Sequence, residues 1–185
     1  TYPISRAIVD QREVGIDTFH FNNALRSSLR QNPDVIMVGE MRDLETIGTT
    51  ITAAETGHLV FATLHTNSAA QTIHRIVDVF PAEQQEQIRF QLSSSLLGIV
   101  SQRLIPRIQG GFIPACEIMV CNNAVGTLIR ENKVHEIPAV IETSSKEGMV
   151  SFSRALVDLA RKKEISMKSA MDYSLNPSEV KNLLK

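Results

Sequence analysis

The residue with the clearest chemical potential in this chain is Glu40, which follows the apolar run 35–38 and Gly39. Four apolar residues in succession are typical of a β-strand covered on both faces of a parallel sheet. Nucleotide sites of α/β proteins form at the carboxyl ends of such strands. A carboxylate there can hold Mg²⁺ through water or orient the water that attacks a γ-phosphate. Glu40 is therefore a candidate catalytic residue and a candidate Mg²⁺ partner.

The alternative is that Glu40 is an exposed acid that merely ends a strand. The residues that follow, Met41-Arg42-Asp43, favour the functional interpretation. A charged cluster at the end of a strand is costly unless its members are paired or have a function.

A second apolar run, residues 59–64, is flanked by His58 and His65. Because seven is an odd number, the two imidazoles point to opposite faces of an ideal strand, and a shared metal is not expected. We interpret His58 as a hydrogen-bonded histidine at the start of a strand. His65 lies at the carboxyl end, beside the end of the strand that carries Glu40, where it could contact a γ-phosphate or transmit its presence.

Two threonines occur close to the same strand end. The hydroxyls of Thr63 and Thr66 could donate hydrogen bonds to phosphate. Helix capping and strand packing account for both residues almost as well, so the two interpretations stay open.

An α/β frame is needed to position these side chains. The pattern predicts a strand over 34–40, a helix over 44–56 with Gly57 after its end, and a strand over 58–64. Strand, helix and strand with short connections predict a right-handed parallel crossover. Upstream, we expect a short strand over 4–9 and a helix that Asp17 or Thr18 caps and Pro33 stops.

The remainder of the chain is predicted to be mostly helical. Helices are expected over 68–79 and 82–98, a two-stranded ribbon over 101–108 and 112–121, and short helices over 123–131, 136–143, 150–162, 167–173 and 177–184. We therefore divide the chain into an α/β core, residues 1–121, and a helical C-terminal region, residues 122–185.

The composition is that of a globular protein, with 43% hydrophobic residues and a formal net charge of −1. This charge balance does not predict a nucleic-acid partner. We expect no transmembrane segment, because no apolar run approaches about 20 residues, and no signal peptide, because Thr1-Tyr2-Pro3 opens onto a polar segment. Cys116 and Cys121 make neither a disulfide framework nor a zinc site, and they fit a reduced, cytosolic setting.

Several sequence blocks together carry a family resemblance. They are residues 11–15, 24–33, 34–43 and 56–67, followed by 74–81 and 102–106. At these separations the blocks resemble the secretion and pilus motor ATPases, and within that superfamily most closely the PilT-like type IV pilus retraction ATPases. The resemblance is strong over residues 9–107 and weak over the tail.

The resemblance implies a partial RecA-like core within a hexameric ring that binds ATP and Mg²⁺. Such a motor couples ATP hydrolysis to pilus retraction, and hence to twitching motility. It is cytoplasmic, peripheral at the inner membrane, and has a pilus platform protein as its partner. On the matching positions, Glu40 is the Walker-B glutamate, Arg42 and Asp43 complete that segment, and His58 and His65 belong to the histidine box.

Two features of the sequence bear on which branch of the family this chain resembles. No cysteine occurs between Phe80 and Ile113, where assembly and secretion relatives commonly carry a four-cysteine module, and this favours retraction. Residues 124–131 read AVGTLIRE, which departs from the retraction motif, AIRAGR or AIRNLIRE, at positions that include the second and third. The alternatives are a pilus-extension ATPase, a type II secretion ATPase, or a non-catalytic module for ring assembly.

The phosphate loop G-x-x-x-x-G-K-[ST] occurs nowhere in the 185 residues, and neither does the family's acidic motif. The chain resembles a family member cut after that motif. Without the N–H groups and the lysine of the loop, little holds a triphosphate. We expect ATP hydrolysis in the full-length protein and none from these residues alone.

Overall fold

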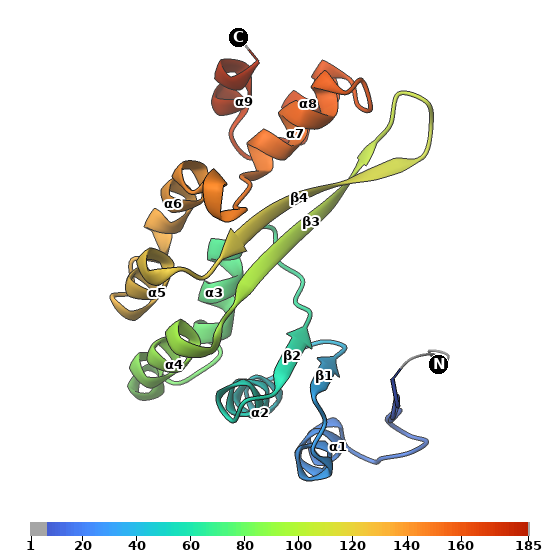
Figure 1. Cartoon of the computed structure of the whole chain (residues 1–185), viewed down its shortest axis with the longest axis vertical. Helices are drawn as coiled ribbons and strands as arrows, with labels where there is room; N and C mark the ends of the chain where they lie inside the picture. The colour runs from blue at the N-terminus through green and yellow to red at the C-terminus, as the bar shows by residue number, and fades with distance from the viewer. Residues whose placement is uncertain (1–6, 185) are drawn as a thin grey trace. The chain divides into compact units, whose positions relative to one another are not determined.

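The computed structural model of the chain describes residues 7–184 (Figure 1). Its contacts divide the chain into two compact units between Leu64 and His65. Among the described residues, no helix combines the length and the apolar character needed to cross a membrane.

The first unit contains the predicted strand–helix–strand. Helix α1 (Phe21–Ser28) and the 3-10 helix η1 (Leu29–Gln31) precede strand β1 (Val35–Val38), helix α2 (Leu44–Glu55) and strand β2 (Leu59–Ala62). The two strands are parallel, with Val35 opposite Leu59 and Val38 opposite Ala62. Gly57 adopts φ +97°, a left-handed conformation that ends α2 at little cost. The parallel crossover is thus confirmed.

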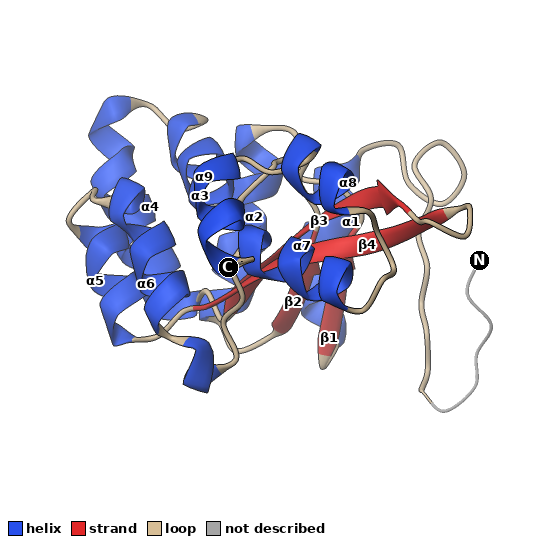
Figure 2. Cartoon of the chain, turned by 90° about the horizontal axis from the view of Figure 1, so that it is seen from above, coloured by secondary structure: helices blue, strands red, loops and turns tan. Residues whose placement is uncertain are grey.

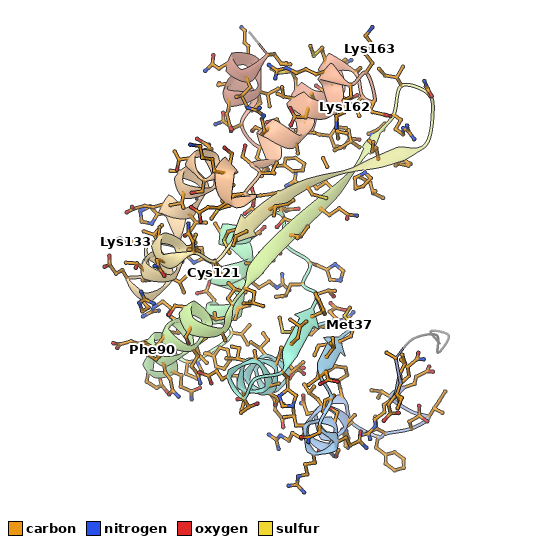
Figure 3. All side chains as sticks on the ribbon, viewed as in Figure 1. Met37, Phe90, Cys121, Lys133, Lys162 and Lys163 are labelled. Atoms are coloured by element: carbon orange, nitrogen blue, oxygen red, sulfur yellow. The ribbon has the colours of Figure 1, made fainter. Side chains whose placement is uncertain are left out.

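Strand β1 is buried on one face, and the expectation that both faces are covered was wrong. Ile36 and Val38 are buried, whereas Val35 is 53% exposed and Met37, labelled in Figure 3, is 62% exposed. Successive side chains of a strand point to opposite faces. An unbroken apolar run therefore does not by itself ensure that both faces are covered.

The start of α1 also differs from the prediction. The helix begins at Phe21, after His20, whose side chain makes no capping hydrogen bond. The Asp17 carboxylate instead accepts from the N–H of Glu13 (2.9 Å), and the Thr18 hydroxyl donates to the carbonyl of His20. Both side chains thus stabilise the preceding turn. Of the strand predicted over 4–9, residues 4–6 lie outside the described part, and residues 7–9 form no strand.

The second unit is built on an antiparallel hairpin. Its elements are α3 (Ala69–Asp78), α4 (Ala82–Ser95), β3 (Gly98–Pro106), β4 (Phe112–Val120), α5 (Asn123–Arg130), η2 (Val134–Glu136), α6 (Ile137–Thr143), η3 (Ser145–Glu147), α7 (Phe152–Arg161), α8 (Met167–Asp172) and α9 (Pro177–Leu183). The predicted ribbon is confirmed, but it starts at Gly98 and not at 101. A Cβ at Gly98 would lie 2.7 Å from the carbonyl oxygen of Met119, so the close approach of the strands requires glycine there.

Helix α7 packs on strand β4, and the two views in Figures 1 and 2 place it along the hairpin. Ile105 and Ala115 of the hairpin share a buried cluster with Phe152, Leu156 and Val157 of α7. Helix α5 packs on α4, so contacts link residues on both sides of position 121. The division into residues 1–121 and 122–185 stays a prediction.

Candidate functional site

The carboxyl ends of β1 and β2 are joined by hydrogen bonds on either side of Glu40. The N–H of Met41 donates to the carbonyl of Thr63 at 3.1 Å, and the Thr63 hydroxyl donates to the carbonyl of Gly39. These two bonds fix the main chain before and after Glu40. The Thr63 hydroxyl thus joins the two strand ends in this structure, and its contact with phosphate stays a prediction.

The Glu40 side chain forms an ion pair with Arg42, with 2.6 Å between Oε2 and Nη2. Glu40 is partly buried, with 26% of its side chain exposed, whereas the Arg42 side chain is 77% exposed. The hydrogen bond to Glu40, and then its charge, raise the pKa of the Arg42 guanidinium. Since a guanidinium donates to both carboxylates and phosphates, Arg42 can direct the Glu40 carboxylate or turn to an incoming anion.

Asp43 caps helix α2. Its carboxylate accepts from the N–H of Thr46 at 2.9 Å and from the Thr46 hydroxyl at 2.7 Å. The main-chain bond, and then the hydroxyl bond, hold the pKa of Asp43 below its usual value. The Thr46 hydroxyl also lies 2.8 Å from Asn22 Oδ1, which links the cap to α1. Asp43 thus fixes the point where the chain leaves the Glu40 segment, and its assignment to the Walker-B segment stays a prediction.

His58 lies at the start of β2, at the other end of that strand from Thr63. Its Nδ1 is 3.0 Å from the carbonyl oxygen of Ala53 and 3.2 Å from the Thr56 hydroxyl. Because a carbonyl oxygen can only accept, Nδ1 carries the hydrogen in this contact. These are the contacts of a hydrogen-bonded histidine that joins α2 to β2.

His65 and Thr66 begin the second unit. His65 is exposed, and the Thr66 hydroxyl lies 2.8 Å from the hydroxyl of Thr72 in α3. The structure thus brings Glu40, Arg42 and Thr63 together in the first unit and attaches the His65 segment to α3 in the second. The expectation that His65 lies beside Glu40 stays a prediction.

Sequence reasoning missed Glu117, in the middle of β4. Its Oε1 accepts from the N–H of Ala69, at the start of α3, at 2.7 Å. Burial raises the pKa of the Glu117 carboxyl, and the hydrogen bond from Ala69 opposes that shift. The available signal for a role of Glu117 was an acidic residue in the middle of a predicted strand. The sequence could not indicate its partner, because Ala69 is 48 positions away.

The donor set fits Mg²⁺ held largely by water. Within residues 7–184 no group of three or more His, Cys, Asp or Glu side chains could form a metal cage. Magnesium keeps several waters and is commonly held by one or two carboxylates plus substrate phosphates. The single carboxylate of Glu40 matches that requirement as one partner of the ion.

Comparisons with known proteins show which family this chain resembles. A family model described as "Type II/IV secretion system protein" matches residues 8–171. The type IV pilus retractation ATPase PilT of Pseudomonas aeruginosa is 51% identical over 172 residues, which cover 93% of this chain and 50% of PilT. A twitching motility protein of Neisseria gonorrhoeae is 49% identical over 172 residues, covering 92% of this chain and 46% of that protein.

A solved structure of a related protein has the same fold as this chain. The crystal structure of the pilus retraction motor PilT with bound ADP superposes with a TM-score of 0.89 at 49% identity, covering 98% of this chain and 51% of that one. The predicted α/β fold class is thereby confirmed. The chain spans about half the length of the curated relatives described above.

Proposed function

The chain belongs to the type II/IV secretion system protein family, and on that premise we propose that it is the motor half of a type IV pilus retraction ATPase. The observation that carries the proposal is the 51% identity to PilT across 93% of the chain. In the full-length protein, a homo-hexameric ring would couple ATP hydrolysis to retraction and so to twitching motility. The ring would be cytoplasmic, peripheral at the inner membrane, and would act on a pilus platform protein.

Glu40 is the residue that we assign to the chemical step. Two main-chain segments tied together by Thr63 hold it at the end of β1, and Arg42 orients its carboxylate. A carboxylate held in this way can orient the attacking water or accept hydrogen bonds from water on Mg²⁺. The ion, when bound, would neutralise charge that develops on the phosphates. A bound ADP in the related PilT structure supports a nucleotide site in this fold.

His65 and Thr66 are assigned to the response to the γ-phosphate. His65 is exposed and immediately precedes a segment bonded to α3, so a contact made by its imidazole could be passed to that helix. His58 and Asp43 support the site by fixing the two ends of α2. We expect neither of them to contact phosphate.

Complementation tests the direction of the motor. The full-length protein, as wild type and as Glu40→Gln, would be expressed in one strain that lacks its retraction ATPase and in another that lacks its assembly ATPase. Wild-type protein should restore twitching in the first strain and should restore no pili in the second. Glu40→Gln should restore neither.

Other outcomes would select the alternatives. Restored pili in the assembly-deficient strain would indicate a pilus-extension ATPase, and restored secretion in a type II secretion mutant would indicate a secretion ATPase. A hexamer that hydrolyses no ATP, with or without substitutions, would indicate a non-catalytic module for ring assembly.

A further inference from the structure

We propose that Glu117 is a positioning residue that fixes the start of α3, and with it the segment carrying His65, to strand β4. This inference rests on the function proposed above for His65. It gives the hairpin of the second unit a part in the reaction, because β4 then determines where the His65 segment leaves the packed core.

The central contact joins a carboxylate to the first turn of a helix. The N–H of Ala69 donates to Glu117 Oε1 at 2.7 Å, and Ala69 is fully buried. The first N–H groups of a helix have no partner within it, and a negative charge there is favourable. A short hydrogen bond to an ionised acceptor is about twice as strong as a neutral one. Glu117 is therefore a strong attachment point for α3.

The residues between His65 and α3 are hydrogen-bonded to the first turn of that helix. The Thr66 hydroxyl lies 2.8 Å from the hydroxyl of Thr72, and the N–H of Asn67 donates to Gln71 Oε1 at 2.8 Å. The two residues that follow His65 are thus bonded to side chains in the first turn of α3. Fixing the turn to β4 also fixes this segment.

The surroundings of Glu117 make the charged form of its carboxyl less favourable than in water. Burial raises the pKa of its carboxyl, and the nearby charge of Glu179 adds to that effect, while the N–H groups of Ala69 and Phe152 and the charge of Arg103 oppose it. The Arg103 guanidinium lies 5.0 Å from the Phe152 ring centroid, and its Nε is buried without a hydrogen-bond partner. Burying a charge is unfavourable unless it is paired and hydrogen-bonded. The hydrogen bonds from the N–H groups of Ala69 and Phe152 supply the compensation.

Hydrogen exchange in the full-length protein tests the attachment. In Glu117→Ala, amide exchange over residues 66–72 should rise by roughly ten- to hundredfold, as expected for a lost charged hydrogen bond. Exchange over α5, residues 123–130, should stay at the wild-type rate. In Glu117→Gln the amide oxygen can still accept from Ala69, although without the charge, so exchange over 66–72 should rise by less than in Glu117→Ala. Glu164→Ala removes an acid paired with Arg107 elsewhere in this unit and is the matched control.

An activity measurement separates positioning from folding. In Glu117→Ala, kcat for ATP should fall by about tenfold with a smaller change in KM, because the substrate still binds while the His65 segment is misplaced. Glu117→Gln should recover most of that loss, and Glu164→Ala should match wild type. Unchanged exchange over 66–72 in Glu117→Ala would overturn the inference, as would an equal rise over α5 or an unchanged kcat.

The two proposals fail in different ways. If wild-type protein hydrolyses no ATP, the proposed function fails, while the exchange data still decide whether Glu117 holds α3. If wild-type protein is active but exchange over 66–72 is the same in Glu117→Ala as in wild type, only the present inference fails.

Discussion

At the scale of single residues, Glu40 is the group on which the proposed chemistry depends. Glu40→Gln keeps the shape of the side chain and removes its charge. ATP turnover by the full-length protein should fall by about 100-fold or more, with nucleotide affinity retained, because a charge-stabilising or water-orienting group is lost. Steady-state hydrolysis and nucleotide titration measure the two quantities. Glu45→Gln is a suitable control, since Glu45 is an exposed acid paired with Arg26. Unchanged hydrolysis in Glu40→Gln would remove Glu40 from the mechanism.

The two histidines should respond differently to substitution. His65→Ala should leave thermal stability close to wild type and uncouple ATP hydrolysis from pilus retraction, because His65 is exposed. His58→Ala loses the contact with the Ala53 carbonyl and should cost about 1 kcal/mol of stability, the usual net worth of such a bond. Thermal unfolding and a twitching assay of both variants distinguish these roles. A large stability loss in His65→Ala would instead indicate a structural histidine.

At the scale of elements, helix α2 depends on the Asp43 cap. Asp43→Ala should lower the free energy of unfolding of the chain by about 1 kcal/mol at neutral pH, the typical loss for an N-cap. Hydrogen bonds from Thr46 lower the pKa of Asp43 in the folded chain. Its charged form therefore adds stability above the ordinary value of 3.8, and this contribution is lost as pH falls below 3.8 toward the folded pKa.

Urea unfolding at neutral pH and at pH values below 3.8 measures this dependence for the cap. Asp43→Asn is the matched variant, because asparagine caps helices as well as aspartate and does not titrate. The difference between wild type and Asp43→Asn should shrink on acidification. A constant difference would show that the Asp43 charge contributes nothing to the cap.

At the scale of the whole molecule, the chain spans about half of the two curated relatives described above, and its sequence contains no phosphate loop. The 185 residues alone should bind Mg-ATP only weakly, because the N–H groups and lysine that hold triphosphate are absent from the sequence. Titration calorimetry of the isolated chain should detect no micromolar binding and no turnover. The full-length protein, titrated in parallel, is the positive control. Micromolar affinity in the isolated chain would contradict the prediction.

The sequence by itself determined the features that depend on local pattern. Apolar runs predicted β1 and β2, and Gly57 predicted the end of α2, because strand period and backbone conformation act over a few residues. The position of Glu40 directly after β1 follows from the same run.

Only the tertiary structure decided which partner each polar group takes. Asp17 bonds within a turn, Thr63 reaches across to Gly39, and Glu117 holds Ala69 from 48 positions away. The exposed face of β1 was likewise decided by packing. Buried polar groups must find partners wherever the folded chain brings a donor and an acceptor together, and sequence periodicity carries no record of those distant pairs.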